Sequence, residues 1–479
     1  MSSGILKGAL WTVLMRLSVR ALGVISLLVL ARIFSPEQFG LIAKAVLFKE
    51  VIALLTQVGI EAALIRNPNA TQQDYNTAWT LTIIRGAAIC LALIIFAPMI
   101  STFFSEPLLK DLILAYAIAM LIQGFTNIGV VDLRKNMTFH LDFNYNMLIK
   151  VSEFIPTLLV AIFLESVWAF PIGVIFGSIT AVGLSYKFSK RKLSLELSGF
   201  KEFFHFGKWM LLHEFSSAIA TKFDTFLLGK LSTNKKLGVY TIGNELATLP
   251  INEIALPVGR ASLPGLSRIS DNKEARLLNT QTLLITLAIA IPASLGISSL
   301  SDEIVKLMLG IEWMATAPLI KVLAFMGPAT VISALSISAI IVKNKVKTLA
   351  FTSLINFLIR CATVYFSYLY FGLIGLCYAV VASGFMRAFS LLFLQIKYEF
   401  IDLSMFMKGI LRPIIASLTM FKVVVIMKET ISFDILLITV LTLVAIGAVA
   451  YISTSYMLWA VFGRPLGIES FILSKLRKQ

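Results

Sequence analysis

The amino-acid sequence predicts an all-α polytopic membrane protein with about 14 transmembrane helices, arranged as two pseudo-symmetric six-helix lobes followed by two C-terminal helices. Three observations predict this class. Hydrophobic residues make up 58% of the 479 residues and charged residues only 14%, whereas soluble proteins average about 45–50% and 25%. Apolar segments long enough to cross a bilayer recur from end to end, and the two halves of the chain repeat one pattern.

We expect one crossing for each apolar segment, with about 25 residues of helix and about 9 of connection. The predicted spans lie near residues 10–33, 38–64, 76–100, 108–131, 143–164, 167–188, 204–230, 237–260, 279–300, 316–342, 348–370, 373–396, 405–427 and 433–459. The first span lacks a small-residue cleavage pattern, so we expect it to remain in the protein. The connections are short and leave no room for a separate catalytic domain.

Basic residues concentrate in the connections on one side of the predicted membrane. That side carries about 20 Lys and Arg residues and the other side six, so both termini are predicted to be cytoplasmic. The asymmetry accounts for much of the net charge of +16. Because the cations are spread over many short loops, we expect no nucleic-acid partner. The basic run 190–192 is expected at the anionic cytoplasmic leaflet, with recruitment of a headgroup or diphosphate as the alternative.

The internal repeat keeps one orientation. Segments that begin at Leu30 and Leu228 match with a constant offset of 198 residues, which places Gly40 on Gly238. An offset of about six spans gives two parallel copies, with a transport path expected between them. The predicted domains are an N-terminal six-helix lobe (1–200), a C-terminal six-helix lobe (201–400), and two additional helices with a basic cytoplasmic tail (401–479).

Charged residues lie inside most of the predicted spans. Each costs about 2.5–3.5 kcal/mol at the centre of a span, so such residues tend to face a bundle interior or a water-filled path, as in transporters. The cations expected along a translocation path are Arg16, Arg20, Lys44, Lys49, Arg85, Lys222, Arg360 and Arg387. Polar residues at helical spacing accompany several of these arginines. The alternative is that the arginines neutralise acids on neighbouring helices or extend toward headgroups.

Acidic residues and one histidine are candidates for ion coupling. They are Glu50, Glu61, His213, Asp224 and Glu245. Such side chains exchange protons or hold Na⁺ through oxygen ligands, so the expected coupling ion is H⁺ or Na⁺. The alternative is internal neutralisation: Lys150 is predicted to pair with Glu153, and Lys222 or another basic neighbour with Asp224. Neither the three histidines nor the three cysteines have metal-ligand spacing, and we expect no cofactor and no metal.

Several motifs resemble one family. ARIFSPEQFGLIA at residues 31–43 and AALI at 62–65 are similar to the first helical hairpin of the polysaccharide-exporter (Wzx-type) flippases of the multidrug/oligosaccharidyl-lipid/polysaccharide superfamily. FGKW at 206–209, LGVY at 237–240 and PGLSR at 264–268 follow the second-lobe pattern of that family. The resemblance covers most of residues 1–400 and weakens in the last two spans.

The resemblance implies a bacterial inner-membrane flippase that moves an undecaprenyl-diphosphate-linked oligosaccharide to the outer leaflet. Such a substrate, a precursor of O-antigen, capsule or exopolysaccharide, is anionic and bulky, which suits a cationic path with alternating access. The glycan and the bilayer are the expected partners, and polysaccharide polymerase and glycosyltransferase machinery are candidate protein partners. One departure is visible: the family often has basic or amide residues around the Asp224 position, where this chain has Thr221, Phe223 and Thr225 beside Lys222.

Two other functions stay open at this level. An ion-coupled multidrug antiporter of the same superfamily should line its cavity with an excess of acid, whereas the charges inside the spans lean basic. A membrane-embedded glycan polymerase or ligase should have a long outer loop, which the sequence lacks. Neither paired carboxylates in a large loop nor a nucleotide-binding glycine-rich motif is visible, so we expect a transporter and not an enzyme.

Overall fold

A computed structural model describes residues 3–55, 60–67, 69–136, 138–197, 208–267, 269, 271–431 and 433–461. Within these residues all regular structure is helical, which confirms an all-α protein. Eight of the described helices are long and apolar enough to cross a membrane, or nine if a pair bent by 50° counts as one span. The protein is therefore a multi-pass membrane protein.

The predicted count of 14 crossings is not confirmed. One reason is charge: α2 (Pro36–Leu55) carries Lys44, Lys49 and Glu50 within one short helix and so is not apolar enough to be counted. The other is continuity, because α16 (Val346–Lys397) holds two predicted spans in one 52-residue helix. Gly372 interrupts α16 with φ of 63° and ψ of −151°, at the boundary between the predicted spans 348–370 and 373–396.

The chain divides into two compact units. Unit 1 comprises Met1–Lys208 and Thr225–Gly238, and unit 2 comprises Trp209–Asp224 and Val239–Gln479. Besides α2, unit 1 contains α1 (Ser3–Ile33), α3 (Ile60–Arg66), α4 (Gln72–Phe104), α5 (Pro107–Gly124), α6 (Val131–Lys135), α7 (Phe139–Leu164) and α8 (Ala169–Phe188). The helices α10 (Lys208–Leu231) and α11 (Asn234–Ser267) each contribute one end to unit 1.

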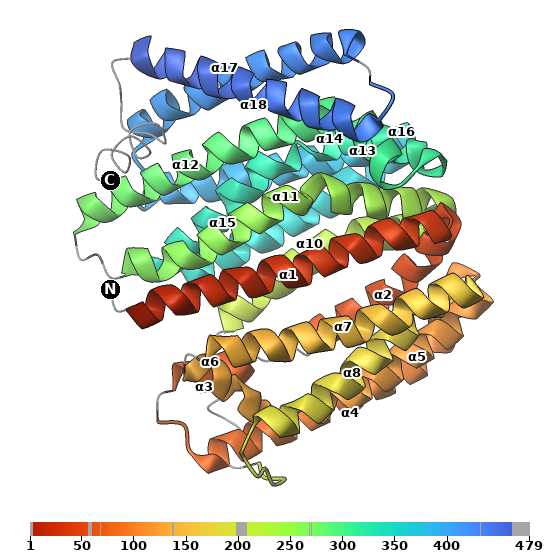
Figure 1. Cartoon of the computed structure of the whole chain (residues 1–479). Helices are drawn as coiled ribbons and strands as arrows, with labels where there is room; N and C mark the ends of the chain where they lie inside the picture. Colours follow the sequence, from red (N-terminus) through yellow and green to blue (C-terminus); the bar gives the residue numbers. More distant parts are fainter. Residues whose placement is uncertain are drawn as a thin grey trace. The chain divides into compact units, whose positions relative to one another are not determined.

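Small residues allow the helices of unit 1 to pack closely. Helix α4 begins with a capping box between Thr71 and Asp74 and packs along α5 (Figure 1). A Cβ atom on Gly86 would fall 2.8 Å from the Cα atom of Gly124, so the two helices approach backbone to backbone. Helix α7 packs on α8 and on α1. Close approach through small residues is how helices associate where lipid provides no hydrophobic drive between them.

The first turns of α2 and α11 form a reciprocal glycine contact in unit 1. A Cβ on Gly40 would lie 1.9 Å from the carbonyl oxygen of Asn234, and a Cβ on Gly238 would lie 1.9 Å from the carbonyl oxygen of Pro36. The repeat offset of 198 residues relates Pro36 to Asn234 and Gly40 to Gly238. The two contacts are thus equivalent under the repeat, and each requires a residue without a Cβ.

Unit 2 contains the other described helices. They are α12 (Asn272–Ser299), α13 (Ser301–Met308), α14 (Ala317–Leu323), α15 (Met326–Val342), α16, α17 (Leu403–Thr430) and α18 (Leu436–Val461), together with parts of α10 and α11. Helix α15 packs on α12 and α16, and α17 packs on α12 and α18. Leu283, Leu287, Val331 and Leu443 lie fully buried in the core that these helices share. The basic tail predicted at the C-terminus lies outside the described residues.

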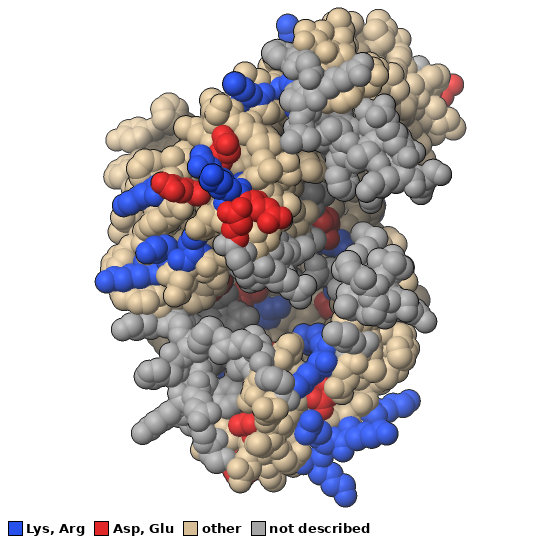
Figure 2. Space-filling view, turned by 90° about the vertical axis from the view of Figure 1, so that its left-hand side faces the viewer, with Lys and Arg blue, Asp and Glu red and all other residues tan. Residues whose placement is uncertain are grey.

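Charge gathers away from the apolar helix surfaces. Figure 2 views the molecule from the left of Figure 1 and shows groups of Lys and Arg side chains that project outward. The helix ends at one side of unit 1 include the start of α1, α6 and the end of α8 (Figure 1). These are the connections in which the sequence concentrates basic residues.

Candidate functional site

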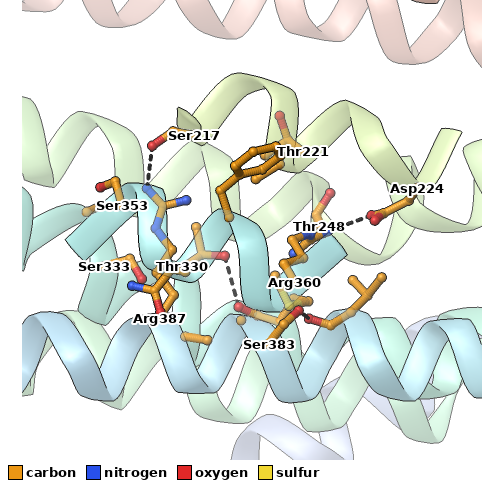
Figure 3. A pocket seen from close by; sticks show the side chains of 18 of the residues that line it. Ser217, Thr221, Asp224, Thr248, Thr330, Ser333, Ser353, Arg360, Ser383 and Arg387 are labelled. Carbon is orange, nitrogen blue, oxygen red and sulfur yellow. Dashed lines mark hydrogen bonds and ion pairs between the residues drawn. The ribbon is translucent and has the colours of Figure 1, made fainter. Parts of the chain in front are cut away.

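A cavity of about 360 Å³, lined by both polar and apolar residues, lies within unit 2 (Figure 3). Five helical segments enclose it: α10, α11, α15 and the two halves of α16 on either side of Gly372. Its polar and charged lining residues are Ser217, Thr221, Asp224, Asn244, Thr248, Thr330, Ser333, Ser353, Asn356, Arg360, Ser383 and Arg387. Hydroxyl and amide groups thus surround two arginines and one carboxylate, in a cavity large enough for a small ligand or part of a larger one.

Asp224 and Arg360 form a buried ion pair at one end of this cavity. Nη2 of Arg360 lies 2.5 Å from Oδ2 of Asp224, and the hydroxyl of Tyr240 donates to the same oxygen at 2.9 Å. The side chains are 3% and 13% exposed for Asp224 and Arg360. Oδ1 of Asp224 and Nε of Arg360 have no hydrogen-bond partner within the described residues. The charge of Arg360 is therefore neutralised, while each partner keeps one polar atom unused.

Arg387 differs from Arg360 in its partners. Its Nη2 donates to Oγ of Ser217 at 3.1 Å, and its Nε has no hydrogen-bond partner in the described part of the chain. No carboxylate oxygen of a described residue lies within 4.0 Å of its guanidinium. Figure 3 shows that both arginines project from α16 toward α10. Glu214 on α10 attracts this guanidinium electrostatically, but no salt bridge between described residues holds it.

Two further hydrogen bonds hold the polar wall. Nδ1 of His213 lies 2.6 Å from Oγ of Ser353, which lines the cavity, and His213 itself is buried. The amide of Asn356 donates to Oγ of Ser390 at 2.8 Å. His213 therefore supports the wall of the cavity, whereas Asn356 and Ser353 form part of it.

The structure places the other candidates of unit 2 away from the cavity lining. Lys222 lies on α10 between the lining residues Thr221 and Asp224, and its side chain is half-buried. Glu245 lies on α11 and is also half-buried. The sequence suggested Lys222 or another basic neighbour as the partner of Asp224, and the structure shows Arg360 in an ion pair with this carboxylate.

The candidates of unit 1 contact different kinds of partner. Lys44 is 2% exposed and pairs with Glu106, with 3.3 Å between Nζ and Oε1. Nζ of Lys49 lies 5.3 Å from the ring centroid of Tyr116. Arg85 donates a hydrogen bond to the carbonyl oxygen of Ala53 at 3.0 Å. Glu61 is exposed and pairs with Arg134 at 3.1 Å. Arg20 and Glu50 are half-buried, and the side chain of Arg16 lies outside the described residues. Arg85 and Glu61 interact electrostatically, and Lys49 and Glu50 both act on Tyr116.

Sequence reasoning missed two partners. Tyr240, which bonds Asp224, and Glu106, which pairs with Lys44, were not candidates. Tyr240 is 16 residues from Asp224 and Glu106 is 62 residues from Lys44, so no helical spacing connects either pair. By contrast, the predicted pair of Lys150 and Glu153 is confirmed, with 3.0 Å between Nζ and Oε2.

The described fold and site define a multi-pass membrane protein with a polar, arginine-containing cavity, which is the architecture of a transporter. Residues 29–318 match the family described as "Polysaccharide biosynthesis protein". Because this match covers more than half of the chain, the protein belongs to that family.

Curated relatives carry names from the same area. The chain is 23% identical over 331 residues to the teichuronic acid biosynthesis protein TuaB of Bacillus subtilis, which covers 67% of this chain and 68% of the relative. It is 24% identical over 335 residues to the lipopolysaccharide biosynthesis protein WzxC of Escherichia coli, which covers 67% and 66%. A third relative is the succinoglycan biosynthesis transport protein ExoT of Rhizobium meliloti, 20% identical over 66% of this chain and 64% of the relative.

Solved structures share the fold. The lipid II flippase MurJ in an inward closed conformation superimposes with a TM-score of 0.78, covering 95% of this chain and 99% of MurJ at 18% identity. A point mutant of the Vibrio cholerae MATE transporter VcmN matches with a TM-score of 0.56, covering 82% and 96% at 10% identity. The protein therefore shares the fold of the flippase MurJ and of the MATE transporter VcmN.

Proposed function

We propose that this protein is a flippase that moves an undecaprenyl-diphosphate-linked oligosaccharide or polysaccharide repeat unit from the cytoplasmic to the outer leaflet of a bacterial inner membrane. The observation that carries the proposal is the agreement of two independent comparisons. The family match over residues 29–318 points to polysaccharide biosynthesis, and the likeness to MurJ extends over 95% of the chain. Membership of that family together with that fold is best explained if the protein carries out the transport step for a lipid-linked glycan.

The cavity chemistry supports an anionic substrate. A diphosphate needs fixed cations and hydrogen-bond donors in a water-accessible path. Arg387 supplies a guanidinium that no salt bridge to a described residue holds, and Ser217, Asn356 and Ser383 supply hydroxyl and amide groups around the same cavity. A cavity of about 360 Å³ takes a diphosphate and part of a glycan, not a whole repeat unit.

Alternating access is the proposed mechanism. Arg16, Arg20 and the other cations of the sequence prediction would contact the headgroup in turn as the path opens to each leaflet. Energy is proposed to come from an ion gradient, with H⁺ or Na⁺ as the coupling ion, or from the membrane potential. Asp224 is the candidate coupling residue that lines the cavity. Both termini are proposed to be cytoplasmic, and polymerase or glycosyltransferase machinery to act on either side of this step.

The test is deletion of the gene in the source bacterium, followed by analysis of extracted carrier lipids and surface polysaccharide. A flippase predicts that a complete lipid-linked repeat unit accumulates while the surface polymer disappears, and that the wild-type gene on a plasmid restores both. If no complete lipid-linked intermediate accumulates, the block lies in synthesis. If the only change is sensitivity to cationic drugs, the protein is an antiporter and the proposal is wrong.

A further inference from the structure

A non-helical segment follows α8 in unit 1 and lies along the first turns of α4. We call this segment, residues 189–197, the strap. It contacts three residues of α4 that lie on one face at helical spacing, Gln72, Asn76 and Thr80. Because each residue of a helix advances 1.5 Å, the strap runs for about 12 Å along α4.

Hydrogen bonds fix the inner side of the strap. They are Gln72 Nε2 to the carbonyl oxygen of Lys192 at 2.8 Å, Asn76 Nδ2 to Ser194 Oγ at 2.8 Å, Ser194 N to Asn76 Oδ1 at 3.2 Å, and Glu196 N to Thr80 Oγ1 at 2.9 Å. Three of these bonds involve the strap backbone, so they do not depend on its outward side chains. The strap is therefore a built part of unit 1.

Arg191 anchors the strap from within the basic run. Its Nε donates to Oδ2 of Asp132 at 2.6 Å, and its guanidinium carbon lies 3.6 Å from the ring centroid of Tyr75. Burial by itself would lower the pKa of Arg191, but the hydrogen bond to Asp132 and the charge of that carboxylate raise it above its ordinary value. Arg191 is thus committed to the protein and is not available to a ligand.

The outward side of the strap combines two cations with two leucines. Lys190 and Lys192 are exposed, and neither side chain forms an ion pair with a described residue. Leu195 is 71% exposed and Leu197 is 53% exposed. The strap thus has a basic end followed by an apolar end. A segment at the membrane interface has this arrangement when its cations contact lipid headgroups and its apolar residues contact the start of the acyl chains.

The surrounding surface indicates what covers this side. Four residues beyond Thr80, α4 continues with Ile84, and Leu91 and Ile95 lie on the face of Ile84; these three residues are 49%, 59% and 55% exposed. Exposed aliphatic residues along a membrane-spanning helix face lipid. The 33 residues of α4 span about 50 Å, whereas the hydrocarbon core is about 30 Å thick, so its first turns reach the interface. The strap therefore covers the polar start of a lipid-facing helix face.

We propose that the strap is a binding edge for anionic phospholipid: Lys190 and Lys192 bind headgroup phosphates while Leu195 and Leu197 enter the acyl boundary. The occupant is a phospholipid because the leucines continue the lipid-facing surface of α4, which a soluble partner or a free diphosphate would not contact. This inference does not depend on which substrate the protein transports. It assigns separate roles to adjacent residues of the basic run, since Arg191 holds the strap and its two neighbours face the lipid.

The first test measures binding of phosphatidylglycerol to the full-length protein in neutral detergent, by thermophoresis or native mass spectrometry. The variant is K190Q/K192Q, and the matched control is K235Q/K236Q, which removes the same charge from two exposed lysines in the first turn of α11, of which Lys235 forms an exposed ion pair with Glu37. Each lysine near an anionic surface contributes about five-fold in affinity. The expected result is that the K190Q/K192Q variant binds several-fold to about 25-fold more weakly, while the control binds as the wild type.

The second test locates the leucines in the bilayer. An environment-sensitive fluorophore is attached at Leu195→Cys in a protein with Cys90, Cys361 and Cys377 replaced by Ala, reconstituted in phosphatidylglycerol nanodiscs. Lipids with a quencher on the upper acyl chain should quench this label strongly and should not quench a label at Asn69→Cys, an exposed loop position. Absence of quenching at position 195 overturns the proposal. So does equal phosphatidylglycerol affinity of variant and control, or displacement of phosphatidylglycerol by inorganic pyrophosphate, which would indicate a diphosphate site instead.

Discussion

The buried pair of Asp224 and Arg360 allows the sharpest prediction about this cavity. Nη2 of Arg360 lies 2.5 Å from Oδ2 of Asp224, and the side chains of Asp224 and Arg360 are 3% and 13% exposed. At an effective dielectric constant of about 20, their attraction is about 6–7 kcal/mol before desolvation is subtracted. Removing one partner of such a pair leaves an uncompensated buried charge and costs about 3–5 kcal/mol. Removing both charges should cost much less.

The perturbation is a double-mutant cycle with Asp224→Asn, Arg360→Gln and the double variant. For a unit of roughly 250 residues, 1 kcal/mol shifts the melting temperature by about 2 °C, so each single variant should melt about 6–10 °C below the wild type. The double variant should recover most of this loss. The assay is thermal unfolding of detergent-solubilised protein, followed by the loss of the monodisperse peak in fluorescence-detected size-exclusion chromatography.

The same three proteins also test the role of Arg360 in transport. If Arg360 contributes to the cationic path, the double variant should be stable and yet export less polysaccharide than the wild type. If the pair is only structural, the double variant should export normally. The reasoning about the pair itself is refuted if the two single variants melt with the wild type, or if their effects add in the double variant.

Three further predictions follow from other contacts. Gly40→Ala and Gly238→Ala each place a Cβ 1.9 Å from a backbone oxygen, so each should lower the free energy of unfolding by about 1–3 kcal/mol. The expected readout is a lower melting temperature and a lower yield of folded protein. Gly296→Ala is the control and should have little effect, because its Cβ would have no atom within 4 Å. Arg387→Gln should lower export in a complementation assay at unchanged protein level, because it removes a cavity-lining guanidinium that no salt bridge to a described residue holds; normal export would contradict this role. Arg191→Gln should speed amide hydrogen exchange in the strap, since the ion pair to Asp132 is lost; unchanged exchange would show that the backbone bonds suffice.

Local and periodic features were predictable from the sequence. The all-α membrane class follows from composition, and the boundary between two predicted spans coincides with the break at Gly372. The pair of Lys150 and Glu153 was predictable because i, i+3 residues are neighbours on a helix. The repeat placed Gly40 on Gly238, and the structure shows these two glycines in equivalent contacts.

Tertiary partners were not predictable. Arg360 and Asp224 are 136 residues apart, so the sequence suggested Lys222 or another basic neighbour for Asp224 without identifying Arg360. Lys44 was a candidate for the path, but its pairing with Glu106 depends on how α2 meets the start of α5. The difference between Arg360 and Arg387 is likewise invisible in the sequence, since both lie in polar stripes of apolar helices.

The most direct test of the central claim is translocation by the purified protein. The lipid-linked repeat unit that accumulates in the deletion strain would be reconstituted in proteoliposomes with and without the protein, under an imposed ion gradient. A membrane-impermeant reagent that oxidises sugars then reports the fraction exposed on the outside. A flippase predicts that nearly all of the glycan becomes accessible with the wild-type protein, and only the outer-leaflet fraction in protein-free vesicles. If the accessible fraction with the protein equals that of protein-free vesicles under H⁺ gradients, Na⁺ gradients and a membrane potential alike, the flippase assignment is contradicted.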